Sequence, residues 1–267
     1  MGPRPGEIVI DDSNFRDFIN PIVDGEVKMC ATLPRDYQKT PYGSVLCAPA
    51  ATIPVIPKSE WSARIKEMVE QESLLSNIWR RQGVDILDQD GTNYCWCFGV
   101  VSACLAVRAV NNLEYVKLSP ASAAAQIKNF RNEGGWGMDA IKYIAANGIA
   151  TQAQWPQAAI EKKYLTAEVK ADMMTRQIQE WDDVGAGKFD LQMTYALLGI
   201  PVAVGYNHWS HEVCQLDPVE VEPGDFGIRI VNSWGENWSD KGMGIMRGSK
   251  AIADDAVAPR VVEANVA

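Results

Sequence analysis

The fold of this chain is decided by the stretch Gln89-Asp90-Gly91-Thr92-Asn93-Tyr94-Cys95-Trp96-Cys97-Phe98. From Cys95 to Val110 the sequence is apolar, with its first charge at Arg108, which predicts a buried helix that begins at Cys95. A cysteine in the first turn of a helix lies where backbone N–H groups and the helix dipole stabilise a thiolate. Gln89, six residues upstream, can supply a side-chain N–H donor beside that sulfur.

Possible partners for the thiol lie far downstream. The chain has only two histidines, His208 and His211, and Asn232-Ser233-Trp234-Gly235 begins 21 residues after the second. His211 lies 116 positions after Cys95, and Asn232 lies 137 positions after it. The sequence therefore gives the order cysteine, histidine, asparagine, but it does not show that the three side chains meet in space.

This order resembles the papain-like cysteine peptidases, in which the histidine and asparagine follow roughly 130–150 residues after the cysteine. Four further segments resemble the family between residues 83 and 250: 83–89, Leu118-Ser119-Pro120, Glu133-Gly134-Gly135-Trp136 and 227–245. The resemblance implies a two-lobed α+β fold with a helical lobe, a β-barrel-like lobe and a cleft between them. A looser resemblance connects the chain with papain-like proteins encoded among bacteriophage structural genes.

The resemblance also implies a role for each site residue. Cys95 would be the nucleophile, and His211 would be the general base that takes the thiol proton. Asn232 would orient the imidazole, while Trp234 would shield that hydrogen bond from water. Gln89, together with the Cys95 backbone N–H, would form the oxyanion hole.

Two glycines would line the cleft. Gly134 and Gly135 would let a substrate backbone approach closely, because no side chain intervenes. The alternative for a Gly-Gly pair is a simple turn. The sequence departs from the family at Asn93-Tyr94, where small residues usually precede the nucleophile, so we expect bulk at the mouth of the cleft.

A second departure follows the histidine. The residue after His211 is Glu212, where the family has a small residue. Its carboxylate could select a basic side chain of the substrate, or it could form a salt bridge with Arg229. His208 competes with His211 as the base, but residues three apart on a strand face opposite ways. A zinc site built on this His-x-x-His pair is disfavoured because no third ligand cluster accompanies it. We therefore expect neither a metal nor a cofactor.

Composition narrows the class of protein. The 267 residues suffice for one two-lobed domain plus an extension. A net charge of −9 argues against nucleic acid or an anionic membrane surface as the main partner. The sequence contains no uncharged apolar stretch of 18 residues, so we expect no membrane-spanning helix. The resemblance to the papain-like peptidases implies a polypeptide substrate as the partner.

The cysteines and the N-terminus bear on location. Residues 1–5 begin no apolar signal region, so we expect the protein to stay where it is made. Six cysteines are present, and Thr92 and Asn132-Glu133 stand where extracellular family members form their usual bridge. We expect reduced thiols and a cytoplasmic, reducing compartment, or incorporation into a virion.

The chain divides by pattern into three parts. Residues 1–58 hold eight of the fourteen prolines and predict an extended arm that covers the cleft or reaches a neighbouring chain, the latter being preferred. Residues 59–182 predict the helical lobe, with helices at 59–82, 95–110, 119–130, 138–147 and 158–182. Residues 183–267 predict the β lobe, with a short helix at 190–198 and strands at 200–206, 211–216, 227–233, 244–247 and 257–263.

Two functions fit this sequence. The first is a thiol hydrolase that cleaves peptide or isopeptide bonds through Cys95, His211, Asn232 and Gln89. The second is a structural or assembly component with a papain-like fold, for example of a virion, whose site is vestigial or only occasionally used.

Overall fold

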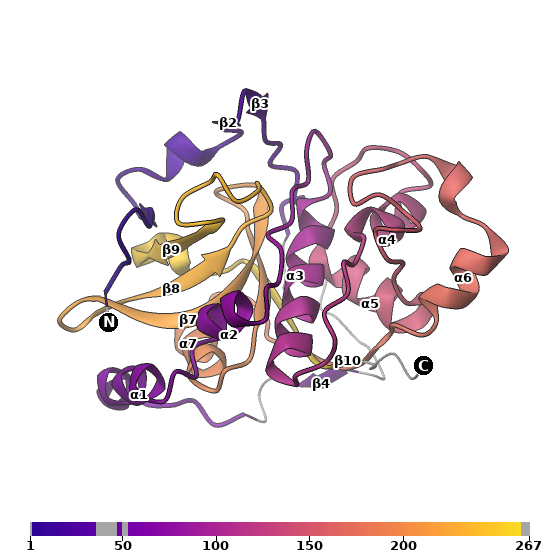
Figure 1. The fold of residues 1–267 in the computed structure, drawn as a ribbon. Coiled ribbons are helices and arrows are strands. Elements are labelled where there is room, and N and C mark those ends of the chain that lie inside the picture. Colours follow the sequence, from indigo (N-terminus) through magenta and orange to yellow (C-terminus); the bar gives the residue numbers. More distant parts are fainter. Residues whose placement is uncertain (1, 36–46, 50–52, 263–267) are drawn as a thin grey trace.

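The computed structural model describes residues 2–35, 47–49 and 53–262. Figure 1 shows a mainly helical side and a side on which the sheet packs with further helices, so the predicted α+β fold class is confirmed. The helices are α1 (Lys58–Glu70), α2 (Leu75–Arg81), α3 (Cys95–Val110), α4 (Pro120–Ile127), α5 (Gly137–Asn147), α6 (Ala167–Met173) and α7 (Phe189–Leu197).

One mixed sheet has the strand order β1-β9-β8-β7-β6-β10-β5-β4. Its end pairs, β1–β9 and β4–β5, are parallel, and the pairs between them are antiparallel. Within the described ranges no pairing of β1 with β4 closes the sheet into a barrel. The strands are β1 (Val9–Ile10), β4 (Cys47–Pro49), β5 (Ile178–Asp183), β6 (Val202–Tyr206), β7 (His211–Glu222), β8 (Asp225–Val231), β9 (Met243–Arg247) and β10 (Asp255–Val262). A separate hairpin joins β2 (Ile22–Val23) and β3 (Glu26–Val27).

Helix α3 lies in the centre of the molecule, between the sheet and helices α4 and α5 (Figure 1). Every residue from Cys95 to Ala109 is buried, as the apolar run predicts. A carbon at Gly99 would touch the Glu212 side chain at 3.1 Å and the Val213 carbonyl at 3.3 Å. The absence of a side chain there lets α3 pack directly against β7, which brings its first turn to the edge of the β lobe.

Three predicted helices are wrong in extent. The helix predicted at 59–82 is divided into α1 and α2, because residues 71–74 leave the helical conformation and Glu72 adopts a left-handed φ of 54°. The helix predicted at 119–130 ends at Ile127, because Asn129 and Phe130 adopt left-handed φ values of 50° and 61°. The Ser119 hydroxyl does not cap it and donates instead to the Pro156 carbonyl. The single helix predicted at 158–182 is replaced by α6 and β5, because residues 178–183 pair with β10.

Helix α1 packs on the β lobe, although its place in the sequence assigned it to the helical lobe. Its buried residues Trp61 and Ile65 join a hydrophobic cluster with Met193 of α7 and Phe226 of β8. The Trp61 and Phe226 rings meet edge to face, with centroids 5.2 Å apart. The chain therefore crosses from the β lobe to the helical lobe after α1.

The first part of the arm belongs to the β lobe. Residues 2–12, called the anchor segment below, add β1 to the edge of the sheet beside β9. The Ile8 carbonyl accepts a hydrogen bond from the Ile245 amide at 2.9 Å, and Ile10 is completely buried. The anchor segment is thus packed on its own chain, and the contact of the arm with a neighbouring chain stays a prediction.

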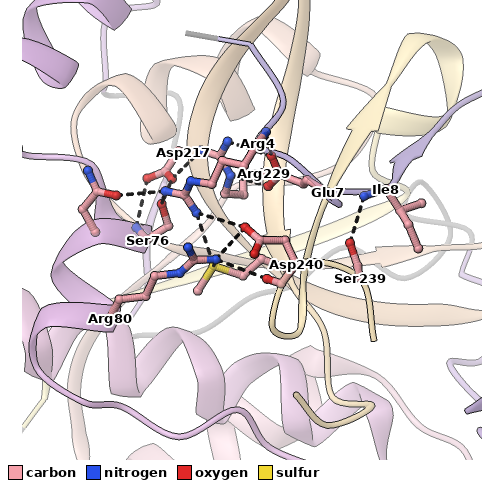
Figure 2. Close-up of polar contacts among 11 residues, drawn as sticks. Arg4, Glu7, Ile8, Ser76, Arg80, Asp217, Arg229, Ser239 and Asp240 are labelled. Atoms are coloured by element: carbon pink, nitrogen blue, oxygen red, sulfur yellow. Dashed lines mark hydrogen bonds and ion pairs between the residues drawn. The ribbon is translucent and has the colours of Figure 1, made fainter. Parts of the chain in front are cut away.

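A buried ion-pair network fixes the anchor segment to three elements (Figure 2). Arg229 of β8 is bonded to both carboxylate oxygens of Glu7 and, at 3.0 Å, to Asp217 of β7. Arg4 donates at 2.6 Å to the Ser76 hydroxyl of α2, which in turn donates to Asp217. The side chains of Arg229, Glu7 and Asp217 are almost fully buried, so each charge depends on its partners.

None of the described helices is long and apolar enough to cross a membrane. Cys30, Cys95, Cys97, Cys104 and Cys214 carry free thiols, and the side chain of Cys47 lies outside the described residues. In the described ranges, no cluster of three or more metal-ligating side chains occurs.

Replacing Glu7 by Gln should destabilise the protein by about 3 kcal/mol, because Arg229 would keep a buried charge with only Asp217 to balance it. The free energy of unfolding would be measured by urea titration. Glu60→Gln is the matched control, since the Glu60–Arg64 pair is exposed and should contribute less than about 1 kcal/mol. Equal effects of the two changes would show that the anchor segment adds little to stability.

Candidate active site

Cys95 is the first residue of α3 and is completely buried. Its sulfur lies 3.3 Å from the Thr32 hydroxyl, and the backbone of Ala31, Glu212 and Trp96 lies close enough to lower its pKa by hydrogen bonding. Burial raises the pKa of the thiol, and these hydrogen bonds oppose the shift. In this structure the helix N-terminus therefore does not produce the low thiol pKa that its position predicts.

His211 and Asn232 meet as predicted. His211 begins β7 and Asn232 directly follows β8, and these paired strands bring His211 Nε2 to 2.8 Å from Asn232 Oδ1. The Trp234 ring stacks on the imidazole, with centroids 4.6 Å apart and planes at 26°. Burial lowers the pKa of His211 to about 4, and the Asn232 hydrogen bond opposes this shift.

The other imidazole nitrogen, Nδ1 of His211, has no hydrogen-bond partner among the described residues. The backbone of Glu212, the next residue, is bonded to the Cys95 sulfur, so this end of β7 lies at the nucleophile. His208 lies in the turn before β7, with its ring 5.5 Å from the ring of Phe15. Of the two histidines, only His211 is bonded to Asn232.

Gln89 is fixed between the two lobes. Its side-chain carbonyl accepts a hydrogen bond from the Ser233 hydroxyl at 2.8 Å. Its side-chain amide donates to the Thr92 carbonyl at 2.9 Å and to the Met29 carbonyl at 2.8 Å. Both amide hydrogens are thus given to peptide carbonyls, and the Met29 carbonyl in the segment that crosses the site is the type of acceptor that an oxyanion donor binds.

Residues 28–35, called the cover segment below, run across this site in an extended conformation. Their backbone forms a parallel bridge between Thr32 and Gly135, and the Leu33 amide donates to the Gly135 carbonyl at 3.1 Å. On the other side, the Thr32 amide donates to the Ser210 carbonyl at 2.8 Å. The segment therefore lies between the two lobes, with hydrogen bonds to each of them.

Gly134 permits this close approach. A carbon added to Gly134 would lie 2.1 Å from the Ala31 carbonyl oxygen, well inside any possible contact distance. At Gly135, an added carbon would instead meet the Trp96 ring at 2.6 Å. Gly134 thus makes room for the backbone of the cover segment, and Gly135 makes room for the Trp96 ring.

Glu212 lies at the wall of the same site and is 1% exposed. Its Oε2 accepts a hydrogen bond from the Gly137 amide at 3.0 Å, while its Oε1 has no hydrogen-bond partner among the described residues. The predicted alternative of a salt bridge with Arg229 is wrong, because Arg229 is paired with Glu7 and Asp217.

Comparison with known proteins agrees with this geometry. No family model matches the chain. Over 215 residues the chain is 25% identical to cysteine proteinase 2 of Entamoeba histolytica, covering 69% of this chain and 68% of that protein. It is also 23% identical to zingipain-1 of Zingiber officinale, covering 67% of this chain and 88% of that protein. The chain is thus similar in sequence to cysteine peptidases of the papain-like kind.

Solved papain-like structures have the same fold. Digestive procathepsin L 3 of Tenebrio molitor larval midgut aligns with a TM-score of 0.62 at 17% identity, over 93% of this chain and 78% of that chain. The bromelain protease of Ananas comosus, solved with the E64 inhibitor, aligns with a TM-score of 0.55 at 20% identity, over 68% and 97%. Several curated relatives are longer, and the chain spans between about half and two thirds of their length.

The sequence analysis did not identify three residues at this site: Thr32, Arg35 and Asp255. Thr32 touches the nucleophile, and Arg35 pairs with Asp255 at 3.0 Å across 220 positions of sequence. No local pattern marks any of them. The proline-rich composition of the chain ends before Ser59, which identified residues 1–58 as an arm. It did not indicate which residues of the arm cross the site.

Replacing Gly134 by Ala should displace the cover segment, because the new carbon would overlap the Ala31 carbonyl. We expect iodoacetamide to alkylate Cys95 at least about tenfold faster, as buried thiols become reactive when water reaches them. Mass-spectrometric mapping of the labelled thiol measures the rate. The control is Gly91→Ala, where an added carbon meets nothing within 4 Å. If both variants are labelled at the rate of the unchanged protein, the cover segment does not restrict access.

Proposed function

We propose that the chain is a thiol peptidase that cleaves peptide or isopeptide bonds, and that its cover segment holds it in a latent state. The observation that carries this proposal is the extended peptide bound across Cys95. Its Met29 carbonyl accepts a hydrogen bond from Gln89, its Thr32 hydroxyl lies 3.3 Å from the Cys95 sulfur, and its Leu33 amide donates to the Gly135 carbonyl. A cleft that binds its own chain through backbone groups can bind a substrate in the same way.

Each site residue has a defined role in the proposed reaction. His211 takes the proton of Cys95, and the thiolate attacks the scissile carbonyl carbon. The imidazolium then donates that proton to the leaving amine, which breaks the C–N bond and leaves an acyl-enzyme. Water, deprotonated by His211, hydrolyses the thioester and restores the thiol. Asn232 keeps the imidazole in the plane required for these transfers.

Gln89 supplies the oxyanion donor in this proposal. Its amide hydrogen, which is donated to the Met29 carbonyl in the covered state, becomes available when the cover segment leaves. The Ser233 hydroxyl donates a hydrogen bond to the side-chain carbonyl of Gln89, and this bond keeps the Gln89 amide in place when the cover segment leaves. The donor is thus positioned before substrate binds, which is the condition for effective stabilisation of the oxyanion.

Latency follows from burial of the Cys95–His211 pair. Desolvation raises the pKa of the Cys95 thiol and lowers the pKa of His211 to about 4. At neutral pH both groups are therefore uncharged, whereas the reactive form of such a pair is the thiolate beside an imidazolium. Departure of the cover segment admits water, which stabilises both charges and favours the reactive form.

Replacing Thr32 by Pro should activate the enzyme. Proline has no N–H, so the bond to the Ser210 carbonyl is lost and the extended segment is displaced. We expect hydrolysis of casein-derived peptides to rise at least about tenfold over the unchanged protein, measured by mass spectrometry of the products. If iodoacetamide labels Cys95 rapidly in the Thr32→Pro variant but the variant cleaves no peptide in a broad library, the peptidase proposal fails.

In the Thr32→Pro background, Cys95→Ala and His211→Ala should abolish detectable turnover. Gln89→Ala should lower kcat by about 10²–10³-fold, the usual effect of losing one oxyanion donor. His208→Ala is the matched control, because His208 lies in the turn before the strand and is not bonded to Asn232. A larger loss for His208→Ala than for His211→Ala would show that the general base is wrongly assigned.

A further inference from the structure

Trp209 lies beside the proposed general base but has no part in the reaction described above. It is 1% exposed and lies in the turn that joins β6 to β7, two residues before His211. The centroid of its ring is 4.8 Å from that of the imidazole, and the two planes are at 64°. The proposed base therefore has a second indole against it, besides that of Trp234.

The two indoles contact the imidazole from different directions. Trp234 is stacked on it, with planes at 26°, whereas the planes of Trp209 and Trp234 are at 89° to each other. A stacked neighbour prevents the imidazole from tilting out of its plane but permits it to slide within that plane. A second ring, perpendicular to the first, limits this sliding. Together with the Asn232 hydrogen bond, the two rings define one position for the imidazole.

The indole of Trp209 is itself fixed by the N-terminal arm. Its Nε1 donates a hydrogen bond of 2.6 Å to the Phe18 carbonyl. Phe18 is the last residue of a short 3-10 helix, Phe15–Phe18, and both of its phenylalanines pack against the hydrophobic cluster that contains Trp209. This helix lies between the anchor segment and the cover segment in the chain. The arm thus contacts a neighbour of the base as well as the nucleophile.

The charge that forms on His211 during the proposed reaction has no carboxylate beside it. Burial lowers the pKa of the imidazole to about 4, and only the hydrogen bond with Asn232 opposes this shift. The titratable side chains on the elements around the imidazole are those of Cys30, Cys95, His208 and Glu212. Within the described ranges, the imidazole forms no ion pair, and its Nδ1 has no hydrogen-bond partner. An imidazolium in such a site can still be stabilised by aromatic rings within about 6 Å.

We infer that Trp209 is a positioning residue in the peptidase proposed above, on which this inference rests for the identity of the base. Its ring keeps the His211 imidazole in place and stabilises the imidazolium that forms when Cys95 loses its proton. The Phe18 carbonyl keeps the Trp209 ring in place. The arm then has two opposite effects: residues 28–35 close the site, whereas residues 15–18 support it.

The test measures alkylation of Cys95 by iodoacetamide in the Gly134→Ala and Thr32→Pro proteins, in which the cover segment is displaced. Mass spectrometry identifies the labelled thiol. At about pH 6 the thiolate depends on an imidazolium beside it, whereas at about pH 9.5 the thiol ionises without that help. We expect Trp209→Leu to lower the rate at the lower pH at least about tenfold, and the rate at the higher pH by less than about twofold. Trp209→Phe keeps a ring but cannot donate to Phe18, so it should lower the first rate about threefold.

Trp155 provides the matched control, because it is also buried and its Nε1 donates to a backbone carbonyl, that of Ala159, at 2.8 Å. Trp155→Leu should leave the ratio of the two rates unchanged, since Trp155 lies in the helical lobe. A ratio that stays unchanged in the Trp209 variants, or that falls equally in Trp155→Leu, overturns the inference. If circular dichroism shows that Trp209→Leu does not fold, Trp209→Phe decides alone, and an unchanged ratio in it overturns the inference.

Peptide cleavage by the same variants separates this inference from the proposed function. A lower alkylation ratio in Trp209→Leu, without cleavage of any peptide by any variant, would refute the peptidase and leave the positioning role of Trp209 standing. Cleavage with an unchanged kcat and an unchanged alkylation ratio would refute the positioning role and leave the peptidase standing. A kcat that falls with the ratio, while KM stays nearly constant, supports both.

Discussion

Burial of α3 along its whole length is the constraint on which the rest of the structure depends. A helix with no solvent-facing side must be enclosed by two layers, and here these layers are the sheet on one side and helices α4 and α5 on the other. Its first residue, Cys95, then lies where the layers meet. The end of β7 that carries His211 lies at the same seam, so the chemistry of the site is a consequence of the packing.

The parts of the site that the sequence predicted are those with a local signature. The apolar run identified α3 and its first residue, and the scarcity of histidine left few candidates for the base. Strand periodicity predicted strands at 211–216 and 227–233, and the structure pairs β7 with β8, which brings His211 and Asn232 to 2.8 Å from each other. Patterns of this kind survive because they reflect backbone geometry, which tertiary contacts seldom change.

The parts that were not predicted depend on contacts between distant, irregular segments. The Arg229–Glu7 pair joins residues 222 positions apart, and the Arg35–Asp255 pair joins residues 220 positions apart. Neither arginine lies in a repeating pattern, and a proline-rich segment resembles a free arm until its partners are known. The helix predicted at 158–182 failed for a similar reason, since pairing with β10 overrode local propensity.

The two ends of the proposed cover are both attached. The anchor segment is part of the sheet on one side, and α1 is packed against α7 and β8 on the other. A segment that is tethered at both ends competes with substrate for the cleft. Its effective concentration at the cleft is high and depends on the length of the tether. Its contacts can therefore be individually weak and still keep the site closed. Dilution of the protein leaves the ratio of closed to open molecules unchanged, so opening requires a competitor in the cleft or a break in the tether.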